Sequence, residues 1–219
     1  MKTESTIRPQ TIERYPSMVR INWDVSQRLM EDSETAMYQY RMMELMGDDL
    51  YIDYAALIEK LITDRYPMRE RLEVLSAGTA TDIAEYRTYV YQCKEAARQF
   101  TGLPETDQMK AEYIETVIEG INAHTDERIL TGFVWEGISV WLSAENQRNF
   151  SEAQRMAEKY GDAVLPLTFK LSEDEDGKAI YHTFRTAEEL DAFYAAAFRY
   201  VNQCLQEGWE EKDKILKEE

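Results

Sequence analysis

Hydrophobic residues recur at helical spacing through the middle of the chain. From Asp53 to Pro67 they fall three and four residues apart, which predicts a helix that Asp53 caps. A second predicted helix begins at Pro67 and ends at Gly78, because both residues interrupt helices. One face of this second helix carries Met68, Leu72 and Leu75.

The third predicted helix, residues 80–100, has the most regular spacing. Its apolar positions alternate in steps of three and four, as in a heptad seam: Ile83, Tyr86, Val90, Cys93, Ala97 and Phe100. A seam of this length favours packing in a helical hairpin or against a second subunit. Gly102 and Pro104 then interrupt the chain, and a fourth helix is predicted over residues 108–123.

The first fifty residues lack helical spacing and are rich in aromatic residues and methionine. Segments 18–24 and 36–45 are predicted to be short strands or extended arms. Strand patterns return at residues 129–142, where two β-rich runs flank a Glu-Gly dipeptide. A turn at this dipeptide would place Phe133 opposite Val140 and Trp135 opposite Ile138.

A helix predicted over residues 143–160, capped by Ser143, separates this hairpin from a second one. The second hairpin has a strictly alternating strand from Leu165 to Leu171 and a return strand at 179–184. The long final helix starts at a capping-box pair, Thr186 and Glu189. The order β-β-α-β-β-α predicts a four-stranded, mainly antiparallel sheet with two helices on one face.

These patterns predict an α+β protein of three segments. Residues 1–50 form an extended or β-rich segment, residues 51–125 a helical domain, and residues 126–219 an α+β domain with a small antiparallel sheet. The chain has 219 residues, of which 44% are hydrophobic, and this is enough apolar material to build a core.

The charge balance limits the partners. The chain holds 42 acidic and 25 basic residues, and its formal net charge of −17 repels phosphate backbones and anionic membrane surfaces. We therefore expect no nucleic-acid or membrane partner. No apolar run reaches membrane-spanning length, and the N-terminus lacks the apolar segment of a signal peptide. Cys93 and Cys204 fall in apolar helical stripes, so we expect buried thiols.

Motifs for common catalytic and metal sites are missing from the sequence. It contains no phosphate-binding glycine loop, HExxH motif, paired CxxC or nucleophile elbow. His182 fits a core-edge histidine with one hydrogen bond better than a general base, and His124 fits a charge partner beside a helix end. The acidic run 174–177 lacks the ligands of an EF-hand and fits a solvated turn. We expect no catalytic residue, cofactor or metal ion.

Aromatic and methionine residues remain as candidates for partner binding. If Trp135 faces the core, Trp141 points to the opposite side, where it either anchors a partner or lies beneath the N-terminal domain. Tyr38, Tyr40 and Met42 fit either an adaptable interface or core filling.

Four stretches within residues 133–215 carry a family resemblance: WLSAENQRNF (141–150), LPLTFK (165–170), YHTF (181–184) and YVNQCLQEGWEEKD (200–213). IRPQTIE (7–13) and parts of 65–100 add to it. The chain resembles an uncharacterised family encoded in tail-gene regions of phages and prophages of gut Bacteroidetes-type bacteria, sometimes labelled tail-fibre or tail-assembly related. The matching positions are Trp141, Leu142, Asn146 and Arg148, and the family has no established catalytic residues.

The resemblance implies a non-catalytic structural or assembly protein of a phage or prophage tail region. It would act through protein–protein contacts with tail or fibre components, or by self-association into a homo-oligomer. Its expected location is the cytoplasm of the bacterial host or the virion. The alternative is an acidic phage-encoded inhibitor or nucleic-acid mimic, which requires carboxylates arrayed along one face. A third reading is an enzyme that acts through carboxylates that no motif marks.

Overall fold

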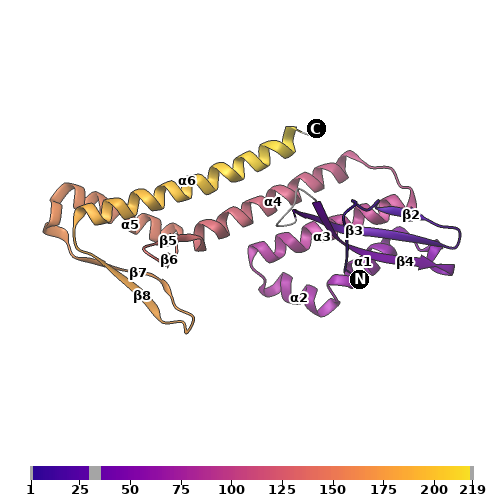
Figure 1. Ribbon diagram of the computed structural model, residues 1–219, viewed down its shortest axis with the longest axis horizontal. Helices are drawn as coiled ribbons and strands as arrows, with labels where there is room; N and C mark the ends of the chain where they lie inside the picture. Colours follow the sequence, from indigo (N-terminus) through magenta and orange to yellow (C-terminus); the bar gives the residue numbers. More distant parts are fainter. Residues whose placement is uncertain (1, 30–35, 218–219) are drawn as a thin grey trace. The chain divides into compact units, whose positions relative to one another are not determined.

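The computed structural model describes residues 2–29 and 36–217 (Figure 1). The chain divides into two compact units, Met1–Gly120 and Ile121–Glu219. The division falls inside helix α4 (Asp107–Thr131). Helices and small antiparallel sheets occur together, which confirms the predicted α+β class.

The first unit begins with a four-stranded sheet in the order β1-β4-β3-β2. Its neighbouring strands are all antiparallel, with bounds Lys2–Ser5 (β1), Ala36–Met46 (β4), Met18–Leu29 (β3) and Ile12–Arg14 (β2). Strands β3 and β4 confirm the strands predicted at 18–24 and 36–45. Because side chains alternate along a strand, β3 directs Val19, Ile21 and Trp23 into the core.

Three helices complete this unit: α1 (Tyr54–Arg65), α2 (Met68–Ala77) and α3 (Ala80–Thr101), after a short 3-10 turn η1 (Gly47–Tyr51). Asp53 caps α1 as predicted, since its side chain accepts a hydrogen bond from the backbone N–H of Ala56 at 2.9 Å. Thr79 and Asp82 form a reciprocal capping box at the start of α3. Gly102 ends α3 in the left-handed region, with φ of 73°.

Sheet and helices of the first unit share one hydrophobic core. We predicted separate segments at 1–50 and 51–125, and the structure packs strand residues directly against helix residues. From the sheet the core takes Val19, Ile21, Trp23 and Leu45; from α1 and α3 it takes Leu57, Leu61, Ile62, Tyr89, Cys93, Ala96, Ala97 and Phe100. The inner face of the sheet is buried against these helices, so the strands and the helices depend on each other for a core.

The buried face of α3 differs from the predicted heptad seam. Cys93, Ala97 and Phe100 are buried as expected, but the core face also includes Tyr89 and Ala96. The Tyr89 hydroxyl accepts a hydrogen bond from Trp23 Nε1 at 3.0 Å and donates one to the Leu61 carbonyl at 2.9 Å. A tyrosine can be buried at this position because both hydrogen-bonding functions of its hydroxyl are satisfied.

Helix α2 presents its apolar face to solvent. The exposed fractions are 63% for Met68, 61% for Leu72 and 54% for Leu75. Beside this face lies a buried arginine, Arg71, whose Nε donates to the Tyr66 carbonyl at 2.6 Å. Its other nitrogens donate to Glu59 at 2.9 Å and to the Thr63 hydroxyl at 2.5 Å. Helix α2 is therefore attached to α1 through polar contacts rather than through its leucines.

The second unit confirms the predicted order β-β-α-β-β-α after α4. Its elements are β5 (Phe133–Trp135), β6 (Ile138–Val140), α5 (Ala144–Tyr160), the 3-10 turn η2 (Gly161–Val164), β7 (Leu167–Glu173), β8 (Ala179–Phe184) and α6 (Ala187–Lys217). Phe133 pairs with Val140 and Trp135 with Ile138, as predicted. The turn between them is left-handed at both positions, with φ of 49° at Glu136 and 81° at Gly137.

The predicted single four-stranded sheet is wrong for the part of the chain that the structure describes. The two hairpins β5–β6 and β7–β8 form separate two-stranded sheets. One hydrogen bond joins them, from the Trp141 N–H to the Leu171 carbonyl at 2.8 Å. The next N–H, from Leu142, turns away to the Leu130 carbonyl at 3.1 Å. The chain then starts α5, so no ladder can form.

Helix α4 is longer than predicted, because it continues to Thr131. It includes His124, which is not at a helix end, and Ile129–Thr131, which we assigned to a strand. Ile129 is buried against the core of the second unit, and Tyr200 of α6 donates a hydrogen bond to the Arg128 carbonyl at 2.9 Å. These tertiary contacts outweigh the β preference of the sequence.

Replacing Arg71 tests the attachment of α2. We expect Arg71→Ala to lower the free energy of unfolding by about 2 kcal/mol, because three hydrogen bonds of a buried guanidinium are lost while Glu59 stays largely solvated. Arg69→Ala is the matched control, since Arg69 is 89% exposed and forms a surface ion pair with Glu73; its loss should stay under about 0.5 kcal/mol. Urea titration followed by circular dichroism measures both, and equal losses would contradict the assignment.

Candidate functional site

The five residues predicted to bind partners do not form one surface. Tyr38, Tyr40 and Met42 lie on β4 in the first unit, whereas Trp135 and Trp141 lie in the second unit. The three β4 residues are half-buried and share the sheet face opposite to Leu45, which points into the core.

Trp135 and Trp141 both have contacts within their own unit. Trp135 packs edge-on against Phe193, with ring centroids 5.5 Å apart, so it faces the core. Trp141 is half-buried, and the Lys170 Nζ lies 5.4 Å from its ring centre. Its carbonyl accepts a hydrogen bond from Asn146 Nδ2 at 2.8 Å. The tryptophan and asparagine of the WLSAEN stretch therefore join a strand end to the start of α5.

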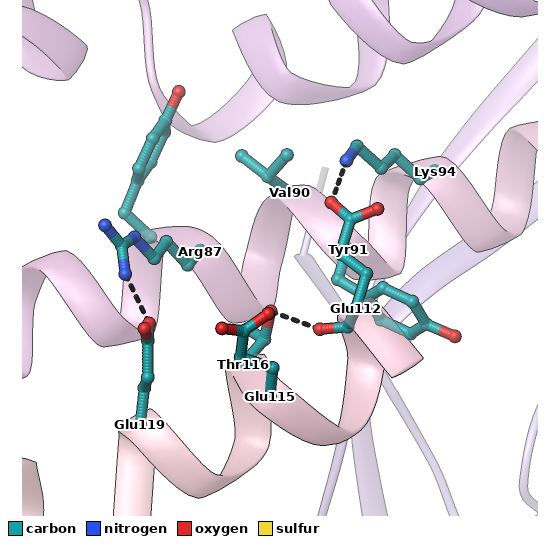
Figure 2. A pocket seen from close by; sticks show the side chains of 9 residues that line it. Arg87, Val90, Tyr91, Lys94, Glu112, Glu115, Thr116 and Glu119 are labelled. Atoms are coloured by element: carbon teal, nitrogen blue, oxygen red, sulfur yellow. Dashed lines mark hydrogen bonds and ion pairs between the residues drawn. The ribbon is translucent and has the colours of Figure 1, made fainter. Parts of the chain in front are cut away.

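A groove of about 370 Å³ lies between α3 and the N-terminal half of α4 (Figure 2). Figure 2 shows glutamates of α4 reaching towards cations of α3, where Arg87 pairs with Glu119 and Lys94 with Glu112. The remaining lining residues are Tyr86, Val90, Tyr91, Glu115 and Thr116. Ion pairs thus span the groove and neutralise much of its charge.

Aromatic stacking adds a second link across this groove. Tyr91 of α3 and Tyr113 of α4 stack with ring centroids 4.6 Å apart. Burial raises the pKa of Tyr91 to about 12, so its hydroxyl remains protonated at neutral pH. No residue of α4 before Thr125 is buried, and this half of the helix is held by side chains at its surface.

A strained aspartate forms a charged cluster in the first unit. Asp24 has φ of 54° and lies at the bulge of β3, between Trp23 and Ser26. Its carboxylate is 3.4 Å from Arg41 Nε and 3.6 Å from Arg65 Nη1. Burial raises the pKa of the Asp24 carboxyl, and the two arginines offset part of that rise. The cluster ties β3 and β4 to α1.

Helix α6 carries an apolar stripe beside its buried face. The stripe follows the straight-helix period of about 3.6 residues and consists of Tyr194, Phe198, Val201, Leu205, Trp209 and Leu216. Phe198 is 61% exposed, Trp209 54% and Leu216 52%. The sequence analysis predicted this final helix from its capping box and did not identify the exposed apolar residues on it. A signal for these exposed residues was present in the sequence, because the apolar residues of this helix spread over more than one face.

An apolar groove of about 230 Å³ opens at the N-terminal end of this stripe. Tyr194, Phe198 and Val201 of α6 line it together with Leu142, Gln147, Phe150 and Ala197. Protein pockets for small ligands usually hold about 300–1,000 Å³, so this groove suits a single inserted side chain.

The histidine and the acidic turn have structural contacts. His182 Nε2 lies 2.8 Å from Glu189 Oε1, and Glu189 also accepts the backbone N–H of Arg185 at 2.9 Å. These two hydrogen bonds, that of Arg185 first, hold the pKa of the Glu189 carboxyl below its usual value. In the turn, Asp174 accepts hydrogen bonds from the N–H groups of Asp176 and Lys178.

Within residues 2–29 and 36–217, no three histidine, cysteine, aspartate or glutamate side chains are grouped to hold a metal ion. No helix in the same residues is both long and apolar enough to span a membrane. Both cysteines, Cys93 and Cys204, are buried free thiols, which confirms that expectation. Burial raises the pKa of Cys93 to about 12.

Comparison with known proteins identifies the C-terminal half. Residues 110–219 match a family described as a domain of unknown function, DUF4376. The chain therefore belongs to the DUF4376 family, and the match covers all of the second unit, including the stripe of α6. No curated protein and no solved structure matches the chain.

Hydrogen exchange tests how α4 is held. We expect the backbone amides of residues 110–119 to exchange faster than those of residues 123–131, since only the second stretch contains buried residues. Removing both groove ion pairs with Arg87→Ala and Lys94→Ala should accelerate exchange at 110–119 by several-fold, as two exposed pairs contribute about 0.2–1 kcal/mol each. Lys159→Ala on α5 is the control. Equal protection of both stretches would show that this description is wrong.

Proposed function

We propose that this chain is a non-catalytic structural or assembly protein of a phage or prophage tail region, and that it acts through protein–protein contacts. The tail assignment is supported by the resemblance in residues 133–215, which lie inside the family match at 110–219. Its partners are tail or fibre components or further copies of itself. Its place is the host cytoplasm during assembly or the finished virion.

The exposed stripe of α6 is the observation that carries the contact function. Large exposed apolar side chains cost solubility, and a continuous patch of them marks a binding surface more often than a free surface. Tryptophan is enriched among residues that dominate binding energy, and Trp209 lies in the stripe with more than half of its surface exposed. The N-terminal part of the stripe is backed by the core, because Phe193, Ala197 and Cys204 anchor the same helix along its other face.

The alternative of an acidic nucleic-acid mimic has weaker support. A mimic needs unpaired carboxylates at phosphate-like spacing along one face. On α4, Glu112 and Glu119 pair with Lys94 and Arg87, and on α6, Glu207 pairs with Arg128. These pairs interrupt the two longest acidic helices.

Affinity purification from phage-producing cells tests the proposed function. A tagged chain expressed from its own phage or prophage should enrich identified tail or fibre proteins encoded by that same phage. The variant Trp209→Glu should lose most of this enrichment, because a charge would have to be buried in the contact. Leu72→Glu on α2 is the matched control, as Leu72 is 61% exposed outside the stripe.

The proposal fails if no tail or fibre protein is enriched by a folded chain. It also fails if Trp209→Glu and Leu72→Glu reduce the enrichment equally. Circular dichroism of each purified variant establishes that the fold is intact.

A further inference from the structure

The stripe of α6 carries a groove at one end and a protruding side chain at the other. The groove at Tyr194, Phe198 and Val201 accepts one side chain, as described above. Leu216 is 52% exposed and lies 22 residues after Tyr194, or about 33 Å along the helix. A surface that carries both a hole and its matching knob is self-complementary under a two-fold rotation.

An antiparallel pair of α6 helices brings each knob to a hole. In a pair centred on Gln206, residues equally far before and after Gln206 face each other. Leu216 of one copy then lies opposite position 196 of the other, between Tyr194 and Phe198. By the same rule, Trp209 of one copy lies opposite position 203 of the other copy, between its Val201 and Leu205. Trp209 and Leu216 of one helix thus meet gaps between apolar side chains of the other.

Opposite charges beside the stripe also face each other in the antiparallel pair centred on Gln206. Arg199 and Asp213 lie on one edge of the stripe, on the side away from the buried face, and both are exposed. They are equally far from Gln206, so the pairing brings Arg199 of each copy opposite Asp213 of the other. A two-fold rotation creates this opposite-charge contact twice.

The exposed apolar area of the stripe limits how large an interface such a pair can form. Aromatic side chains bury about 150–250 Å² each, so the exposed parts of Phe198 and Trp209 are each roughly 100 Å². With a similar contribution from Leu216, two copies would bury roughly 600 Å² of apolar surface, plus polar edges. Specific, stable interfaces bury about 1,200–2,000 Å², and weak transient ones bury less. The pair is therefore expected to be a weak, reversible contact.

We infer that a second copy of this chain occupies the stripe, as an antiparallel α6–α6 pair in which Leu216 of each copy enters the groove at Tyr194, Phe198 and Val201 of the other. The inference deepens the proposed function, since it names one of the protein–protein contacts and rests on the same stripe. The pair is a reversible dimer that assembles at high local concentration.

Sedimentation velocity of the full chain over a dilution series tests this pair. The native chain should show a monomer–dimer equilibrium, and Phe198→Glu or Leu216→Glu should raise the dissociation constant at least tenfold. Arg199→Asp should weaken the dimer several-fold, and adding Asp213→Arg should restore it. Asp213 also pairs with Lys217 at 3.4 Å within its own helix, so Arg199→Asp is the cleaner single change. Leu72→Glu should leave the equilibrium unchanged.

A native chain that remains monomeric up to about 1 mM would overturn the pairing. A dimer that Leu72→Glu weakens as much as Leu216→Glu would also overturn it, and failure of the double charge exchange to restore the dimer would overturn the register. These outcomes are distinct from failure of the proposed function. A monomer that still enriches tail proteins refutes only the pair, whereas a dimer that enriches none refutes only the tail function.

Discussion

Packing around Phe193 holds the C-terminal unit together. The ring is fully buried, and its centroid lies 4.9 Å from those of Phe150 and Phe184, 5.5 Å from Trp135 and 6.0 Å from Phe133. These four rings come from α5, β8 and β5, so one side chain of α6 joins both hairpins and a second helix in one core. Two-stranded hairpins are marginal in water on their own, and their placement here depends on this contact.

The same helix presents a second apolar face to solvent. Phe198 follows Phe193 by five residues, which rotates it by about 140° around the helix axis. Phe193 is therefore buried while Phe198 stays exposed. Because the buried face anchors α6, a stripe that binds as we propose would lose little conformational entropy around Phe198 and Val201. Helix α2 of the first unit also has an exposed apolar face, but polar contacts of Arg71 attach it instead of an apolar core.

Local signals in the sequence predicted local structure well. The hairpin of Phe133 and Val140 and the cap by Ser143 depend on neighbours a few residues away, and the structure reproduces both. Contacts between distant residues were harder to predict. Ile129 has strand character but packs as helix against α6, and the burial of Tyr89 depends on Trp23, 66 residues away. The exposed stripe was missed because apolar spacing marks faces without showing which one is buried.

One face of α6 builds the core of the second unit, and the neighbouring face is exposed to solvent. Comparing Phe193→Ala with Phe198→Ala by urea unfolding at low protein concentration tests this arrangement most directly, since both changes remove the same ring from the same helix. Phe193→Ala should cost about 3–5 kcal/mol in free energy of unfolding, whereas Phe198→Ala should cost under about 1 kcal/mol. Similar losses for the two variants would mean that the stripe belongs to the core, and the account would be contradicted.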